Sequence, residues 1–222
     1  IPKGETTYKA YTTRVQTSPI TRVSATQAGT DTGGVWTKVA DGEYLYTFGV
    51  KAPSGYDRTA SHRVAMYANR NLSEFDLGIN LADTVFDFVP DGSKVTVVRD
   101  IVATASCNRC HDKLSAHGTT GRSTVPVCIT CHQPQTTDPD TGNTVDMATM
   151  VHKIHMGADL PSVKAGKPYQ IIGNAQSMHD FSEVEFPADV RRCETCHDQN
   201  ATNAQKDAYL KPSRRACGSC HD

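Results

Sequence analysis

The stretch CNRCH at residues 107–111 decides how this chain folds. It is a Cys-x-x-Cys-His motif, and the 222-residue sequence contains four such motifs. They are Cys107/Cys110/His111, Cys128/Cys131/His132, Cys193/Cys196/His197 and Cys217/Cys220/His221. The motifs use all eight cysteines of the chain, so a single chemistry should account for every thiol.

Three chemistries use cysteine pairs of this spacing. In c-type haem attachment the two thiols bond to the porphyrin and the following histidine binds the iron. Zinc ribbons also pair such motifs, and the separations of Cys110 from Cys128 and of Cys196 from Cys217 suit them. Disulfides within the motifs would close only short loops. Because zinc and disulfides need no histidine after every second cysteine, the sequence predicts four covalent c-type haems, each with its motif histidine as proximal ligand.

Composition restricts the location and the partners. The formal net charge is -1, which gives no reason to expect nucleic acid as a partner. No run of apolar residues is long enough to cross a membrane, and the first residues do not read as a signal peptide. Haem attachment to thiols takes place outside the cytoplasm. We therefore expect a mature or excised exported chain, extracellular or at the cell surface, with a periplasmic location as the alternative.

Residues 1–104 are predicted to form a β-rich domain, a small antiparallel sandwich or barrel. Asp41-Gly42 lies between two alternating runs, which is a strong hairpin signal. In the second run Tyr44, Tyr46, Phe48 and Val50 share one face, which should be buried. Further predicted strands lie at 6–15, at 62–68, and at 84–89 with 94–98, the last two joined by a turn at residues 90–92.

Residues 105–222 are predicted to form a tetrahaem domain of short helices and loops. The sequence is only 37% hydrophobic. Of its 15 aromatic residues, 11 precede position 105. A segment so poor in apolar side chains cannot build a core of its own, so the porphyrins should supply it.

Five histidines lie outside the motifs and are candidates for the opposite face of each iron. Two of them, His152 and His155, are three residues apart in a predicted helix that Asp146 would cap and Gly157 would end. His117 precedes Gly118 in a predicted loop. For the last iron His62 and His179 compete, and His62 is favoured. Four bis-histidine haems leave no position for a substrate, which predicts electron transfer and not catalysis.

Four stretches carry a resemblance to a known family: RDIVATASCNRCHDKLSAHG, CITCHQPQTTDPDTGNTVDM, MVHKIHMGADLPSV and FPADVRRCETCH. They resemble the OmcA/MtrC-type surface cytochromes of metal-reducing bacteria. The resemblance implies a β-rich domain beside a multihaem domain that passes electrons to minerals, shuttles or partner cytochromes. It also implies axial roles for His117, His152 and His155.

Four motifs are fewer than that family commonly has, and the length is instead similar to OmcE-type tetrahaem cytochromes, which polymerise into extracellular filaments. This predicts identical subunits in a head-to-tail filament, in which His62 of one subunit binds the terminal iron of its neighbour. Two alternatives remain open at this point. One is a monomeric periplasmic or surface carrier whose last iron is completed internally, and the other is a terminal reductase with an open haem.

Overall fold

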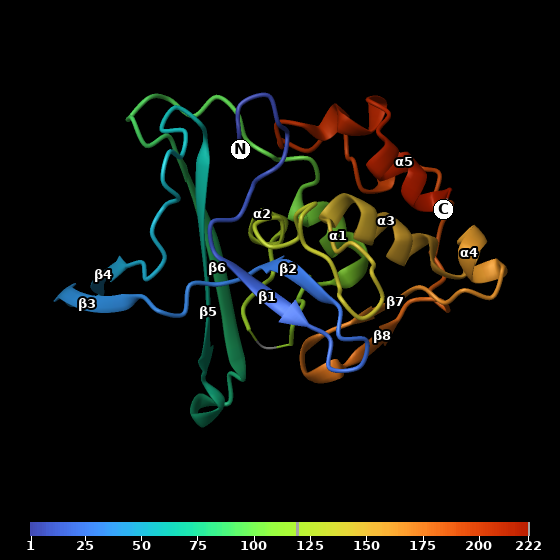
Figure 1. Cartoon of the computed structure of the whole chain (residues 1–222), viewed down its shortest axis with the longest axis horizontal. Coiled ribbons are helices and arrows are strands. Elements are labelled where there is room, and N and C mark those ends of the chain that lie inside the picture. The colour runs from blue at the N-terminus through green and yellow to red at the C-terminus, as the bar shows by residue number, and fades with distance from the viewer. Residues whose placement is uncertain (119, 222) are drawn as a thin grey trace.

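The structure is a computed structural model that describes residues 1–118 and 120–221. The first half of the chain consists of β-hairpins, and the second half consists of short helices joined by long loops (Figure 1). The strands are β1 Thr13–Thr17, β2 Ser24–Ala28, β3 Val35–Ala40, β4 Glu43–Thr47, β5 His62–Asn71, β6 Ile79–Phe88, β7 Gln170–Ile172 and β8 Met178–Asp180. The α-helices are α1 Thr104–His111, α2 Val125–Cys128, α3 Met147–Met156, α4 Pro161–Lys164 and α5 Arg214–Cys220. Short 3₁₀ turns are η1 Ser73–Phe75, η2 Gly157–Asp159, η3 Asn174–Gln176, η4 Cys193–Thr195 and η5 Lys206–Leu210.

The predicted combination of a β-rich first part and a helix-and-loop second part is confirmed. The described strands pair as separate two-stranded antiparallel sheets, β1 with β2, β3 with β4, β5 with β6 and β7 with β8. The first part is thus a set of hairpins where a single sandwich or barrel was expected. The reason lies in packing, because the first and third hairpins contact the second half of the chain: β1–β2 bonds to the 136–140 loop, and β5–β6 lies against α2.

Strand pairing also differs in detail from the expectation. The turn at residues 90–92 does not join two strands, because residues 79–88 are already paired with β5 over the full register from His62↔Phe88 to Asn71↔Ile79. A ten-residue partner offers more ladder bonds than the short 94–98 segment could. The Asp41-Gly42 hairpin is confirmed as β3–β4. The burial predicted for its aromatic face is wrong, since Tyr44, Phe48 and Val50 are exposed.

The apolar core is small and joins the two parts of the chain. Ile1 and Tyr8 pack against Val125 and Ile129 of the α2 region. Partly buried Cys107, Leu114 and Met147 surround them. The described chain exposes 14100 Å². A compact protein of this mass exposes about 10,000 Å². The polypeptide therefore does not fill its own interior, as expected for a chain organised around cofactors.

A buried ion pair fastens the β5–β6 hairpin to this core. Arg63 donates to both carboxylate oxygens of Asp87, at 2.8 and 2.7 Å, and to the carbonyl of Pro126. Its guanidinium also lies over the ring of Tyr8, whose hydroxyl donates to Asp87. The Arg63 side chain is only 5% exposed. The loss of either charge would leave the other buried and unpaired.

We expect Asp87→Ala to lower the free energy of unfolding by about 3 kcal/mol, because removing one partner of a buried ion pair leaves a desolvated charge. Chemical denaturation of the haem-loaded protein measures this. Asp41→Ala is the matched control, since it breaks the exposed Lys38–Asp41 pair and should cost less than about 1 kcal/mol. Equal effects for the two substitutions would contradict the role given to Arg63.

Candidate haem-binding site

Each Cys-x-x-Cys-His motif is built on helical or 3₁₀ backbone. The first ends α1, the second continues from α2, the third begins with η4 and the fourth ends α5. In the second and third motifs the histidine N–H donates to the carbonyl of the first cysteine, at 2.9 Å for His132 and 2.8 Å for His197. Residues three and four apart on such a turn project to the same side. The two thiols of each motif can therefore attach to one porphyrin, and the imidazole of the same motif can bind its iron.

The eight cysteines predicted to attach haem differ in their exposure. Cys110, Cys193 and Cys217 are exposed. The other five are partly buried, namely Cys107, Cys128, Cys131, Cys196 and Cys220. Desolvation is the main cause that raises the pKa of the Cys128 thiol to about 11, and it also raises the pKa of Cys107 and Cys196. In the absence of a bound metal, desolvation therefore favours the neutral thiol over the thiolate at these three partly buried cysteines.

Cys131 lies outside the helix of its motif, because α2 ends at Cys128, just as η4 of the third motif ends at Thr195, before Cys196. Cys131 lies in the turn that follows, where its N–H donates to the Cys128 carbonyl at 3.2 Å. Its sulfur is a free thiol, 4.0 Å from the hydroxyl oxygen of Thr130, where the sequence predicts a thioether to haem. The turn keeps Cys131 close to Cys128 and His132, and haem attachment at Cys131 stays a prediction.

Three motif histidines face a second histidine from elsewhere in the chain. The ring centroids are 6.0 Å apart for His111 and His155, 5.9 Å for His117 and His132, and 6.5 Å for His152 and His197. An imidazole nitrogen lies about 2 Å from a metal that it binds, and its ring centroid about 1 Å beyond, so two axial imidazoles on one metal have centroids about 6 Å apart. The three pairs therefore have the spacing that bis-histidine ligation of one iron requires.

Backbone carbonyls orient the imidazoles. The Nδ1 atoms of His132, His152 and His155 lie 2.9, 2.7 and 2.8 Å from the carbonyl oxygens of Val145, Ala148 and Val151. A carbonyl only accepts, so each Nδ1 carries the proton and donates it. This leaves Nε2 deprotonated and available to a metal, as second-shell bonds to ligand histidines commonly do.

Burial favours the neutral form of four of the paired imidazoles, those of His117, His132, His152 and His197. Desolvation lowers the pKa of His132, His152 and His197 below the usual value. It is also the main cause that lowers the pKa of His117 to about 4, with Arg122 as a further cause. Iron binds neutral imidazole, so the environment favours the protonation state that ligation needs.

Helix α3 serves two motifs at once. As predicted, Asp146 caps its N-terminus, accepting from the backbone N–H of Thr149 at 3.4 Å, and Gly157 follows its last residue. His152 faces His197, while His155, three residues on, faces His111. One turn of one helix thereby connects the first and third motifs.

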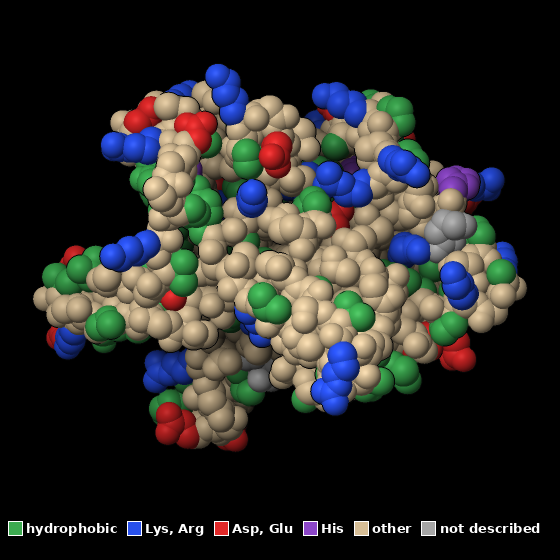
Figure 2. All heavy atoms as spheres, viewed as in Figure 1, with side chains coloured by type: hydrophobic (Ala, Val, Ile, Leu, Met, Phe, Trp, Pro, Cys, Tyr) green, Lys and Arg blue, Asp and Glu red, His purple; other side chains and the backbone are tan. Residues whose placement is uncertain are grey.

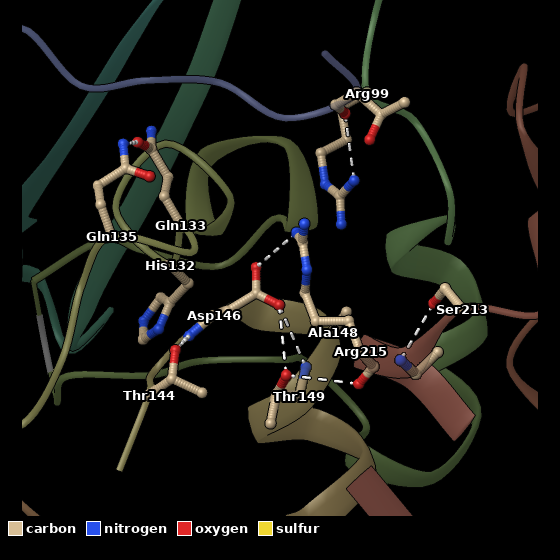
Figure 3. A network of polar contacts seen from close by, with 12 residues as sticks. Arg99, His132, Gln133, Gln135, Thr144, Asp146, Ala148, Thr149, Ser213 and Arg215 are labelled. Atoms are coloured by element: carbon tan, nitrogen blue, oxygen red, sulfur yellow. Dashed lines mark hydrogen bonds and ion pairs between the residues drawn. The ribbon is translucent and has the colours of Figure 1, made fainter. Parts of the chain in front are cut away.

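Asp146 lies at the junction of three of the binding segments (Figure 3). Besides capping α3, its carboxylate is 3.7 Å from the guanidinium of Arg215 on α5, and it is almost fully buried at 2% exposure. The preceding residue, Val145, supplies the carbonyl that orients His132. The carboxylate therefore ties the second motif to α3 and to the helix of the fourth motif.

We expect Asp146→Ala to lower the free energy of unfolding by about 2 kcal/mol, from the lost helix cap and the lost partner of Arg215. Asp146→Asn keeps an oxygen for the Thr149 N–H, so it should cost about half as much. Denaturant titration of the haem-loaded variants provides the comparison. A midpoint for Asp146→Ala equal to that of the unsubstituted protein would refute the junction.

Two packing partners of the histidines carried no signal in the sequence. Phe186 lies against the ring of His155 at 5.6 Å, and Tyr209 against that of His197 at 5.5 Å. Neither has a characteristic spacing from a motif, so only the folded chain identifies them. Both are apolar surfaces of the kind that line a porphyrin.

The last motif has no histidine opposite it within the described residues. The residue favoured for that role, His62, lies among the rings of Tyr11, Tyr56 and Phe88, and β5, which it begins, is on the side of the molecule away from α5 (Figure 1). The Nδ1 of His62 contacts the Ala60 carbonyl at 2.8 Å, the same arrangement as in the paired histidines.

The Nε2 of His62 contacts the hydroxyl of Tyr11 at 2.6 Å. A metal bound at this nitrogen would displace that hydroxyl, whose hydrogen bond is exposed and can pass to water. The rival, His179, contacts Ser177 at 3.2 Å and no other histidine ring among the described residues.

The rival chemistries fit this structure poorly. Among the described residues, none of the first three motifs holds a disulfide between its two cysteines. Across residues 1–118 and 120–221, no three or more histidine, cysteine or acidic side chains come together as a metal site would need. Two imidazoles alone do not satisfy a six-coordinate metal, whereas a porphyrin supplies the remaining four nitrogens. The cysteines and the paired histidines therefore fit haem.

Repeated Cys-x-x-Cys-His motifs whose histidines face further imidazoles define the class of multihaem c-type cytochromes. The family model described as "Outer membrane cytochrome MtrC/MtrF-like, domains II/IV" matches residues 99–222, more than half of the chain. The chain belongs to this family of MtrC/MtrF-like outer membrane cytochromes. Membership confirms the resemblance predicted from the motifs. It also confirms the predicted location, which is outside the cytoplasm at the cell surface.

Individual relatives are considerably longer than this chain. It is 26% identical over 196 residues to the multiheme cytochrome MtrC of Shewanella baltica, a match that covers 85% of this chain and 29% of that protein. The crystal structure of the outer membrane decaheme cytochrome OmcA superposes with a TM-score of 0.77 at 26% identity, over 96% of this chain and 34% of OmcA. MtrC from S. baltica superposes with a TM-score of 0.56 at 25% identity, over 90% of this chain and 30% of MtrC. The chain thus spans about a third of the length of these relatives.

Membrane-spanning helices are not found in this fold. Of the helices formed by the described residues, none is long and apolar enough to cross a bilayer.

Proposed function

We propose that the chain is an extracellular electron-transfer protein, not an enzyme, with four covalent c-type haems. Bound through the eight cysteines, these haems would supply one-electron chemistry at iron. We also propose a boundary between a β-rich domain at 1–104 and a tetrahaem domain at 105–222. Other cytochromes or extracellular metal oxides would exchange the electrons. The observation that carries the proposal is the set of three opposed histidine pairs at bis-histidine spacing.

Within one chain, three histidine pairs would hold three of the four irons, keep them closed to substrate and keep neighbouring irons near one another. These pairs are His111 with His155, His132 with His117, and His197 with His152. Because His152 and His155 are one helical turn apart, the two irons that they bind must lie close together. Low-spin irons with two fixed imidazoles change geometry little on electron transfer, which suits a conduit.

The terminal motif supports assembly into a head-to-tail filament. His221 has no partner histidine among the described residues, whereas the His62 imidazole is oriented by the Ala60 carbonyl and faces none of the four motifs. Since β5 and α5 lie on opposite sides of the subunit, we propose that His62 binds the terminal iron of the next subunit (Figure 1). A heterologous contact of this kind gives a filament when successive subunits do not close into a ring, and we propose that identical subunits polymerise in this way.

A second function is also compatible with an unpaired His221, namely a terminal reductase that keeps the sixth position of this iron open. A carbon monoxide difference spectrum of the reduced, haem-loaded protein separates the two. The assembled protein is expected to bind no carbon monoxide, because all its irons have two histidines. His62→Ala should leave one haem in four open to carbon monoxide and abolish assembly.

His179→Ala is the matched control, and it should behave like the unsubstituted protein. Carbon monoxide binding at one haem of the assembled, unsubstituted protein would favour the reductase. Discrete monomers that bind no carbon monoxide would favour a carrier completed within one subunit. Either result would overturn the filament.

A further inference from the structure

The β3–β4 hairpin projects from the body at the end of the molecule opposite to α5 and the C-terminus (Figure 1). Asp31 holds its base by accepting from the Gly33 and Gly49 N–H groups, at 3.3 and 2.7 Å, and from the Tyr46 hydroxyl at 3.1 Å. A side chain on Gly49 would meet the backbone of Gly33, so the two strands cross closely there. The shape of the hairpin is therefore fixed before anything binds to it, which reduces the entropy lost on association.

One face of the hairpin is an aromatic ladder. Trp36 contacts Tyr44 and Tyr46 with ring centroids 6.5 and 4.6 Å apart, and Tyr46 contacts Phe48 at 5.1 Å. Exposure is 57% for Trp36, 56% for Tyr44 and 49% for Phe48. Aromatic side chains placed in this way are the residue types that dominate binding energy in protein interfaces.

The other face is aliphatic and equally open. Val35 and Leu45 point away from the ladder, because neighbouring residues of a strand alternate between faces, and they are 62% and 57% exposed. Val39, at the irregularity between Lys38 and Ala40, is 60% exposed. Hydrophobic side chains are visible along this arm in Figure 2. Six such side chains expose roughly 500 Å² of apolar surface. A standard interface buries about 800 Å² per partner, of which a little over half is apolar. The exposed apolar surface of the hairpin alone is about as large as that apolar part.

We propose that this hairpin docks on residues 206–215 of a second copy of the chain. The inference rests on the proposed head-to-tail assembly and names its contact surfaces. The hairpin forms one end of the subunit, and the segment that contains η5 and the start of α5 lies on the other side of the body, at the upper right of Figure 1, so that in a head-to-tail assembly the hairpin of one copy can meet that segment of the next.

Charge and exposure support this partner. The hairpin carries Asp41 and Glu43 against one cation, Lys38, whereas residues 206–215 carry four cations and one carboxylate. Within the receiving segment Leu210 is 64% exposed, which provides an apolar contact between the cations. Opposite charges around an apolar centre fix register and favour this pairing over others.

Charge reversal tests the contact in the haem-loaded full chain. Asp41→Lys/Glu43→Lys and Lys211→Glu/Arg214→Glu should each raise the concentration needed for assembly at least about tenfold. All four substitutions in one chain should restore assembly, because every subunit then carries both reversed surfaces. Light scattering and electron microscopy record the polymers.

The apolar contact has its own matched pair of variants. Trp36→Ser/Tyr44→Ser/Phe48→Ser should raise the assembly concentration about a hundredfold. The control, Ile20→Ser/Phe75→Ser/Leu77→Ser, removes three other exposed apolar side chains and should change nothing. Far-UV circular dichroism should be the same for both triple variants, since all six residues are exposed.

The outcomes separate this inference from the proposed function. If His62→Ala prevents assembly while the hairpin variants assemble normally, the docking surface is wrong and the filament stands. If the unsubstituted chain never assembles, the proposed filament fails, and the docking surface with it. Failure of the fourfold variant to assemble would overturn the pairing with residues 206–215. An aromatic triple variant that assembles normally but no longer binds phosphatidylcholine vesicles would also overturn it, and would assign the hairpin to a lipid surface.

Discussion

The chain is expected to lose cooperative folding when haem attachment is blocked at all four motifs. With every motif cysteine changed to serine, far-UV circular dichroism should show little helix and the thermal transition should disappear. The hydrodynamic radius should rise toward that of an unfolded chain of this length. This is the largest effect that we predict, because it removes the proposed core of residues 105–222.

The reason is the shortage of apolar packing. The described chain exposes about 40% more surface than a compact protein of its mass, and its core cluster joins only a few side chains around Val125 and Ile129. Burial of apolar area is the main favourable term in folding, and here the polypeptide alone supplies little of it. Conformational entropy then exceeds what remains.

A single-motif variant provides the control. Cys217→Ser/Cys220→Ser removes only the haem at α5, whose Cys217 is exposed, so this variant should keep a cooperative transition. Cys128→Ser/Cys131→Ser should destabilise the chain more, because this pair is partly buried beside the core residues Val125 and Ile129. A sharp thermal transition in the variant without any attachment site would contradict a haem-built core.

The second large effect concerns which histidine serves which iron. His152→Ala should open the haem on Cys193/Cys196, and His155→Ala that on Cys107/Cys110, since the ring pairs are His152 with His197 and His155 with His111. Each variant should bind carbon monoxide at one more haem than the unsubstituted protein does. The iron that loses an imidazole should also change from low spin to high spin, because its ligand field becomes weaker.

A double-substitution cycle assigns the pairs. In a Cys193→Ser/Cys196→Ser background the third haem is absent, so adding His152→Ala should open no further haem. Adding His155→Ala to the same background should open one. These two histidines lie on one helix three residues apart, so helix damage alone would affect both additions alike. The opposite pattern would reverse the assignment, and equal effects would refute it.

Local signals in the sequence predicted local features well. The Cys-x-x-Cys-His motifs, the Asp146 cap of α3 and the Asp41-Gly42 turn each depend on residues within one turn of the chain. The pairing of His152 with His197 and the contact of the β5–β6 hairpin with α2 depend on which distant segments meet, and spacing does not encode that. Periodicity identified the aromatic strand 43–47, because alternation along a strand is local. It gave no sign that the apolar face of this strand stays exposed, because exposure depends on which other segments pack against it.

The histidine pairs could be predicted only in part from the sequence. Counting five spare histidines against four irons predicted bis-histidine ligation, and His117, His152 and His155 do each face a motif histidine. The count could not assign partners, because His152 and His155 project from one helix toward different motifs. Nor could it place the ligand of the last iron, which we propose lies in another molecule.

The most direct test of the whole account is electron cryomicroscopy of the native assembled protein at a resolution that shows axial ligands. We predict four haems in each subunit, three with both imidazoles from one chain, and the haem on Cys217/Cys220 with His221 on one side and His62 of the adjacent subunit on the other. A terminal iron ligated within its own subunit, or left open, would contradict a filament joined by coordination.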